Sequence, residues 1–262
     1  LFAYGPLRLY GLPPGDGAGA GVAGFPWLRP AAGHHLLGPV ERLMAPVPPG
    51  ARVLMETRSA HRDAGGYRTV FQAAEASLSV RGAELVPDEY ARAFNPGFVR
   101  VLLAGFAALA EGGAGEREVR EMARSAGAGW ILAFDPATVR ALAAMGWREE
   151  GRLVPSSLPA ATARLLAMPG AELVLLRAPF AAGTLDPPVA DAAIERNTLR
   201  WTARAGVEYR VAYAWDPRFR ARQGGGEVAV RADEAAGGDF RAIRLRATSD
   251  GPLALTFHGG WL

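Results

Sequence analysis

The sequence has no lysine and no cysteine, so all 29 of its basic residues are arginine. Without lysine, the chain has no Schiff-base nucleophile and no Walker-type phosphate lysine. Without cysteine, it has no thiol nucleophile, no disulfide and no cysteine-ligated metal site. No apolar run approaches the roughly 20 residues that a bilayer-spanning helix needs. The longest run, 101–110, predicts a buried helix instead.

The charge is nearly balanced despite the many arginines. The 262 residues carry 26 acidic side chains, and the net charge at pH 7 is only +3. Because arginines and acids are interleaved, a coding bias explains the arginines more simply than recognition of phosphate or carboxylate does. The same interleaving argues against a nucleic-acid partner. Half of the chain is hydrophobic, which is enough to build one large domain or two small ones.

The clearest fold signal is a pair of alternating runs in the last third of the chain. Residues 199–203 and 207–215 each place apolar and aromatic side chains on one face and polar ones on the other. Successive side chains of a strand point to opposite faces, so the runs predict a half-buried antiparallel sheet. Further short runs, separated by glycine-rich turns, extend this prediction to a small sandwich or half-barrel. They lie at 227–231, 241–247 and 253–257.

The preceding region mixes short apolar strands with helices. Strands are expected at 51–57, 67–71 and 130–134, helices at 87–93, 98–110, 116–125 and from Asp135 onward, and a hairpin from 162–167 and 172–177. This order predicts an α+β (or α/β) fold class. The expected division is a Pro/Gly-rich approach segment (1–50, with a short helix at 39–44), a small mixed α/β domain (51–178), a linker (179–196) and an antiparallel β-sandwich-like domain (197–262).

One polar cluster directly follows the strand expected at 51–57. Glu56, His61 and Asp63 could form an acid–base pair, and Arg58 and Arg62 could clamp an anion. Ligands of open α/β sheets bind beyond the carboxyl ends of strands. The alternative interpretation is a solvated loop with ordinary ion pairs, because position in a fold alone does not establish function.

The aromatic residues of the β region are a second candidate. Trp201 and Tyr213 share a stripe that could stack on a sugar. Such stripes are more often the core face of a sheet, and the parity of these residues matches that of the other apolar positions. We therefore favour a core role and keep the two residues as ligand-binding candidates.

Three further motifs are set aside. The GxGxxG at 19–24 lacks the preceding strand and following helix of a dinucleotide site. Ser125 resembles a nucleophile elbow, but the expected helix precedes it and the strand follows, which is the reverse order. His34 and His35 have no third ligand at a recognisable spacing, so no metal site is expected. No cofactor is expected either.

Several apolar segments follow one another in a recognisable order. They are RVLME (52–56), GWILA (129–133), VLLRA (174–178), NTLRW (197–201) and YRVAYAWDPRFRA (209–221). The succession resembles the C-terminal extracytoplasmic region of polytopic bacterial membrane proteins, the glycosyltransferase-C-like and YfhO-like proteins. Phe219 stands in the place of the family's tryptophan, and Gly224–Gly226 replaces its Asp-Gly turn. The catalytic acids of that family, where they exist, lie in membrane loops, so no functional residue carries over.

The resemblance implies a non-catalytic accessory module on the extracytoplasmic face of a bacterial membrane. Its implied partners are the membrane-embedded part of the same protein or a glycan or lipid-linked sugar. The start at Leu1, without an initiator methionine, fits a chain cut from something longer. Two alternatives remain open: a module that binds a glycan or small anion, and a hydrolase or transferase that uses Glu56, His61 and Asp63.

Overall fold

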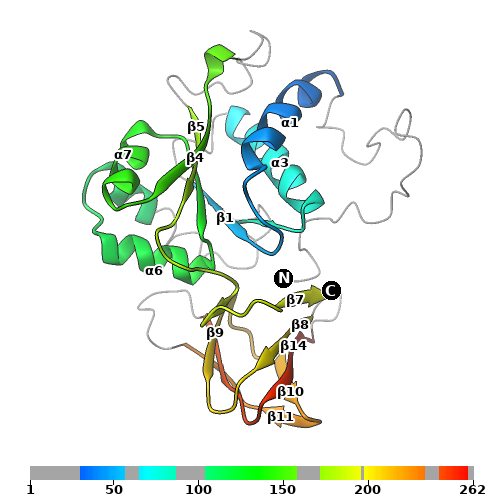
Figure 1. Ribbon diagram of the computed structural model, residues 1–262. Helices are drawn as coiled ribbons and strands as arrows, with labels where there is room; N and C mark the ends of the chain where they lie inside the picture. The colour runs from blue at the N-terminus through cyan, green and yellow to red at the C-terminus, as the bar shows by residue number, and fades with distance from the viewer. Residues whose placement is uncertain are drawn as a thin grey trace.

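The computed structural model describes residues 30–56, 65–86, 104–157, 172–195, 198–233 and 242–258. They form an α/β unit and, below it in Figure 1, a sandwich of two antiparallel sheets. The predicted class, a mixed α/β domain followed by an antiparallel β-sandwich-like region, is confirmed. Among the described helices, none has both the length and the hydropathy that crossing a membrane requires.

The α/β unit is built on a five-stranded sheet, sheet A, with strand order β2-β1-β3-β5-β4. Strand β1, second in this order, pairs in parallel with β2 and β3, whereas β5 pairs antiparallel with β3 and β4. The strands are β1 (Arg52–Met55), β2 (Glu84–Val86), β3 (Trp130–Ala133), β4 (Arg148–Leu153) and β5 (Leu173–Arg177), and a short 3-10 helix, Pro155–Ser157, follows β4.

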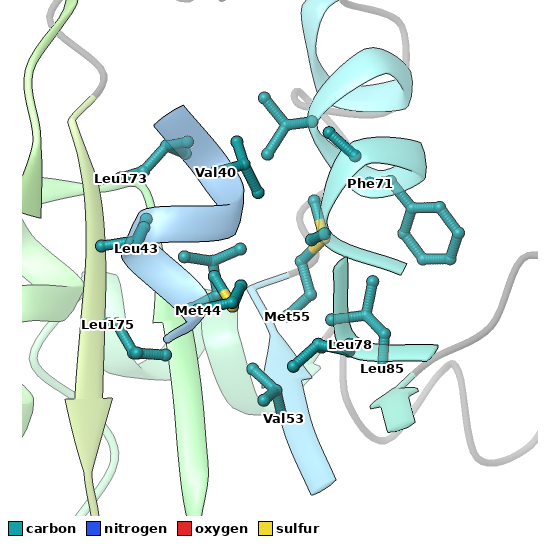
Figure 2. Close-up of a cluster of buried hydrophobic side chains, with 14 of the residues drawn as sticks. Val40, Leu43, Met44, Val53, Met55, Phe71, Leu78, Leu85, Leu173 and Leu175 are labelled. Atoms are coloured by element: carbon teal, nitrogen blue, oxygen red, sulfur yellow. The ribbon is translucent and has the colours of Figure 1, made fainter. Parts of the chain in front are cut away.

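Helices cover both faces of sheet A, which explains why its inner strands are almost continuously apolar. On one face, α1 (Pro30–Met44) and α3 (Gly65–Val80) pack against Val53 and Met55 (Figure 2). On the other face, Leu54 packs with α6 (Glu116–Ala126), α7 (Pro136–Ala144) and a helix whose described residues are 104–110. Alternate residues of each strand therefore enter different cores.

The sandwich unit consists of two antiparallel sheets, B and C. Sheet B has the order β12-β13-β9-β6, and sheet C has the order β11-β10-β14-β8-β7. The strands are β6 (Leu185–Asp186), β7 (Ala193–Glu195), β8 (Thr198–Ala203), β9 (Glu208–Ala214), β10 (Phe219–Gln223), β11 (Gly226–Val228), β12 (Val230–Ala232), β13 (Ala242–Arg246) and β14 (Gly251–Phe257).

The core between these sheets follows the alternation in the sequence. Most residues expected to point inward are almost fully buried, among them Trp201, Val211, Ile243, Leu245 and Leu255. Two at the end of the second run depart from this expectation, because Tyr213 is only half-buried and Trp215 is 36% exposed. The two alternating runs, however, belong to different sheets: β8 lies in sheet C and β9 in sheet B. The turn between them therefore carries the chain from one layer of the sandwich to the other.

The two units are in direct contact. Arg52 on β1 donates hydrogen bonds from Nη1 to the carbonyl oxygens of Ala126 (3.1 Å) and Ala212 (2.7 Å), and from Nε to Glu84 (2.7 Å). Ala242 on β13 packs within the same core cluster as Leu54 on β1. The units are thus joined by a buried guanidinium and a shared patch of core.

Several expected boundaries need correction. The short helix expected at 39–44 begins at Pro30 and packs as α1 on the α/β core, so residues 30–50 are part of that unit. Residues 67–71 belong to the helix α3 rather than to a strand. The strand expected at 172–177 is β5, which pairs with β3 and β4, while its expected partner at 162–167 lies outside the described residues.

The segment expected as a linker, 179–196, contains two strands. Within it, β6 pairs with β9 and β7 pairs with β8, so the segment adds an edge strand to each sheet of the sandwich. The run at 227–231 also divides, because β11 joins sheet C and β12 joins sheet B. These strands are only two or three residues long, too short to show an alternating pattern.

Candidate functional site

Glu56 lies immediately after β1 and is fully buried. Its Oε2 accepts hydrogen bonds from the backbone N–H groups of Phe134 (2.6 Å) and Asp135 (2.9 Å), and its Oε1 accepts one from Oγ1 of Thr138 (2.8 Å). Burial raises the pKa of this carboxyl above its usual range, although the three hydrogen bonds act in the opposite direction.

The position of Glu56 is the point where ligands bind in many α/β proteins. The chain places β2 on one side of β1 and β3 on the other, both parallel to it, so a topological switch point lies between β1 and β3. Asp135, the predicted N-cap of α7, follows β3 and accepts a hydrogen bond from the N–H of Ala137 (2.7 Å). The Glu56 carboxylate thus accepts hydrogen bonds from the backbone N–H groups at this switch point.

The other candidates of the polar cluster are not described by the structure. His61, Asp63, Arg58 and Arg62 all lie outside the described residues. Their distances from Glu56 therefore stay untested. Both carboxylate oxygens of Glu56 already have hydrogen-bond partners inside the fold.

The aromatic candidates pack inside the sandwich or against the neighbouring unit. Trp201 is 3% exposed and meets Tyr209 edge to face, with ring centroids 5.5 Å apart. Tyr213 is half-buried, and the guanidinium carbon of Arg52 lies 4.2 Å from its ring centroid. In this structure, Trp201 offers no open ring face and Tyr213 already stacks on a cation.

A cleft between the two units was not expected from the sequence. Its volume is about 410 Å³. Helix α6 supplies one wall, the end of β6 supplies another, and sheet B supplies the floor. The lining residues are Glu121, Arg124, Asp186, Pro187, Glu208, Arg210, Asp233 and Arg244.

A row of charged residues crosses sheet B at this cleft. Asp186 is directly opposite Arg210, Arg210 is opposite Arg244, and Arg244 is opposite Arg231. Residues directly opposite one another share a face of the sheet. Three arginines therefore stand side by side on strands about 4.8 Å apart, an arrangement that needs counter-charges.

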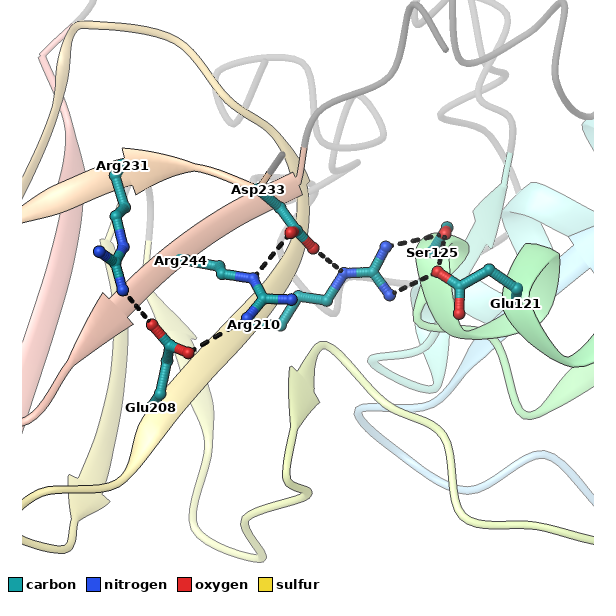
Figure 3. A network of polar contacts seen from close by, with 7 residues as sticks. All are labelled: Glu121, Ser125, Glu208, Arg210, Arg231, Asp233 and Arg244. Atoms are coloured by element: carbon teal, nitrogen blue, oxygen red, sulfur yellow. Dashed lines mark hydrogen bonds and ion pairs between the residues drawn. The ribbon is translucent and has the colours of Figure 1, made fainter. Parts of the chain in front are cut away.

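Carboxylates separate these arginines (Figure 3). Asp233, which is 2% exposed, lies 3.0 Å from Nε of Arg210 and 2.7 Å from Nε of Arg244. These contacts are charge pairs rather than aligned hydrogen bonds. Glu208 joins Arg244 to Arg231. On the α6 side, Arg210 reaches Glu121 (3.0 Å) and Ser125 (3.0 Å), so the network crosses from the sandwich to the α/β unit.

The sequence gives no signal for this cleft, because its residues come from segments far apart in the chain and share no motif. Within the part of the chain that the structure describes, no group of three or more His, Cys, Asp or Glu side chains could hold a metal ion.

Comparison with protein-family models, with curated proteins and with solved structures found no match for this chain.

Proposed function

We propose that this chain is a non-catalytic accessory module of a polytopic bacterial membrane protein of the glycosyltransferase-like, YfhO-like kind, placed on the extracytoplasmic face. In this proposal its partner is the membrane-embedded part of the same protein, or a glycan or lipid-linked sugar that this part handles. The order of apolar segments in the sequence motivates the family, and the β-rich mixed fold is compatible with it.

The non-catalytic role is supported by the burial and the hydrogen bonds of the Glu56 carboxylate. A general base must present a lone pair to its substrate, within hydrogen-bond distance of the proton that it removes. Both carboxylate oxygens of Glu56 instead accept hydrogen bonds from Phe134, Asp135 and Thr138. Because the side chain is also fully buried, a substrate could reach this carboxylate only if the surrounding core opened, which supports a structural role.

A turnover assay separates the accessory role from the hydrolase or transferase alternative. The chain and its Glu56→Gln and His61→Ala variants are incubated with a panel of hydrolase and glycosyl-transfer substrates. We expect no turnover from any of them. Turnover in the parent that either substitution abolishes, while thermal melting shows the variant to be folded, would establish the enzymatic alternative.

The membrane association has its own test. The full reading frame of the gene is determined and translated upstream of Leu1. We expect several hydrophobic spans there, as in the polytopic proteins that the sequence resembles. A reading frame without such spans would remove the accessory role.

A further inference from the structure

The cleft between α6 and sheet B has the size and place of a ligand site. Small-molecule sites range over about 300–1,000 Å³ and are common where two structural units meet. The volume here, about 410 Å³, lies toward the lower end of that range. Its lining is strongly charged rather than apolar, so the ligand that fits must be small and must carry charge.

The charged side chains on the floor of the cleft already form ion pairs with one another. Arg210 uses Nε on Asp233, Nη1 on Glu121 and Nη2 on Ser125. Its side chain is only 12% exposed. Asp233 is shared with Arg244. These groups fix the shape of the cleft, and recruiting Arg210 for a ligand would mean breaking contacts that are largely shielded from water.

Two lining residues do not take part in these ion pairs. Arg124, in the last turn of α6, and Asp186, at the end of β6, both have exposed side chains. Neither forms an ion pair with any residue that the structure describes. They come from different walls of the same cleft and carry opposite charges.

We infer that this cleft binds a small zwitterion, with its anionic group on Arg124 and its ammonium group on Asp186. The lining has four acids and three arginines, which gives a net charge of −1. A ligand with only a negative charge would be repelled by this excess of carboxylates. A ligand with only a positive charge would leave the Arg124 guanidinium without a counter-charge. An α-amino acid and an aminoalkyl phosphate share the required chemistry, and arginine can bind either anionic group through two parallel hydrogen bonds.

This inference goes beyond the accessory role and does not depend on it. A soluble zwitterion can bind the cleft whether or not the chain is attached to a membrane protein. Failure to bind would leave the membrane proposal standing, and failure of the membrane proposal would leave the cleft intact.

Calorimetric titration of the whole chain tests the inference. The probes are glycine and phosphoethanolamine as zwitterions, and acetate, inorganic phosphate and ethylamine as ions of one charge. We expect saturable binding of one molecule of at least one zwitterion and weaker binding of every single-charge probe. A preference for glycine would indicate a carboxylate ligand, and a preference for phosphoethanolamine would indicate a phosphate ester.

Neutral variants then locate the site. Arg124→Gln and Asp186→Asn should each weaken binding of the zwitterion by about tenfold or more, equivalent to about 1.4 kcal/mol. Arg117→Gln is the matched control, because Arg117 lies on the same helix and its side chain is 92% exposed. Glu227→Gln, at an exposed position of β11, is the control for Asp186.

Three results would overturn the inference. They are the absence of binding by both zwitterions, equal binding by a single-charge probe, and binding that Arg124→Gln and Asp186→Asn leave unchanged. Thermal melting of each variant shows that it is folded, so a lost signal reports on the site.

Discussion

The guanidinium carbon of Arg52, on strand β1 of the α/β unit, lies 4.2 Å from the ring centroid of Tyr213 in the sandwich. The same side chain donates to a backbone carbonyl in each unit, those of Ala126 and Ala212. One arginine thereby fixes the contact between two separately built cores. Arginine suits this place because its planar fork can stack and donate in several directions at once.

Replacing Arg52 should weaken the whole fold. We expect Arg52→Met to lower the free energy of unfolding by about 3 kcal/mol, the lower end for breaking a buried pair, because Glu84 is 24% exposed and can recover water. Urea denaturation measures the loss. Arg117→Met, at an exposed site, should stay within about 0.5 kcal/mol of the parent. Equal losses in the two variants would show that the Arg52 contacts contribute little.

Gly127, at the end of α6, should not tolerate a side chain. Its φ is +63°, and a Cβ there would lie 2.7 Å from both the Cβ of Ala212 and the carbonyl oxygen of Gly183. Gly206 has a similar φ of +76°, but its nearest neighbour would be 4.0 Å away. We expect Gly206→Ala to cost about 1–2 kcal/mol, the left-handed backbone penalty alone. Gly127→Ala should cost clearly more in the same denaturation assay, and a smaller loss would contradict the tight contact between the units.

Stability should depend on pH through Glu56. Burial raises the pKa of its carboxyl, so its contribution to stability is fully present below the unfolded pKa, about 4.3. That contribution is lost as the pH rises through the higher folded pKa. Glu56→Gln keeps hydrogen-bonding groups but cannot titrate there. We therefore compare the free energy of unfolding of the parent with that of Glu56→Gln at each pH. The difference, parent minus variant, should fall as the pH rises from about 4, the unfolded pKa, and then level off. A difference that grows with pH would mean that the three donors outweigh burial.

Asp233 should be the most sensitive acid of the charged network. It is buried between Arg210 and Arg244, so Asp233→Asn leaves two guanidinium groups without their shared counter-charge. We expect a loss of about 3–5 kcal/mol in the free energy of unfolding, as for other broken buried pairs. Glu208→Gln, at a more exposed position of the network, should cost less than about 1 kcal/mol. The reverse order would contradict the geometry of the network.

Leu245 tests the register of the sandwich. It is 1% exposed and points between the sheets. Leu245→Ala should cost about 2–5 kcal/mol, the usual range for a buried leucine. Leu37→Ala, at a leucine that is 37% exposed, is the control and should cost much less. Equal losses in thermal or urea unfolding would place Leu245 on the wrong face.

The elements predicted well are those whose signal is local. The alternation in 199–203 and 207–215 depends only on neighbouring residues, and so does the Asp135 cap with proline at the next position. The elements predicted badly have a misleading local signal. Residues 67–71 are rich in aromatic and β-branched side chains that favour strands. They form part of α3, which packs its buried face on the core.

Strand β10 was missed for a different reason. Its sequence, FRARQ, alternates between buried and exposed positions but carries only one large apolar residue, Phe219. Its pairing with β14 places that ring 5.1 Å from the ring of Phe257. Such pairing depends on residues distant in the chain. The cleft could not be predicted for the same reason, because Arg124 and Asp186 line one cleft only when the two units pack together.

Ala242 is part of the core of the α/β unit although it belongs to a strand of the sandwich. A chain divided at residues 179–184, between β5 and β6, would therefore yield two fragments that each expose a surface normally covered by the other. Expressed separately, the fragments should be less soluble than the intact chain. Expressed together, the two fragments carry the complementary surfaces needed to reassemble. Dividing the chain at this connection would therefore give a two-fragment system whose reassembly reports on the contact between the units.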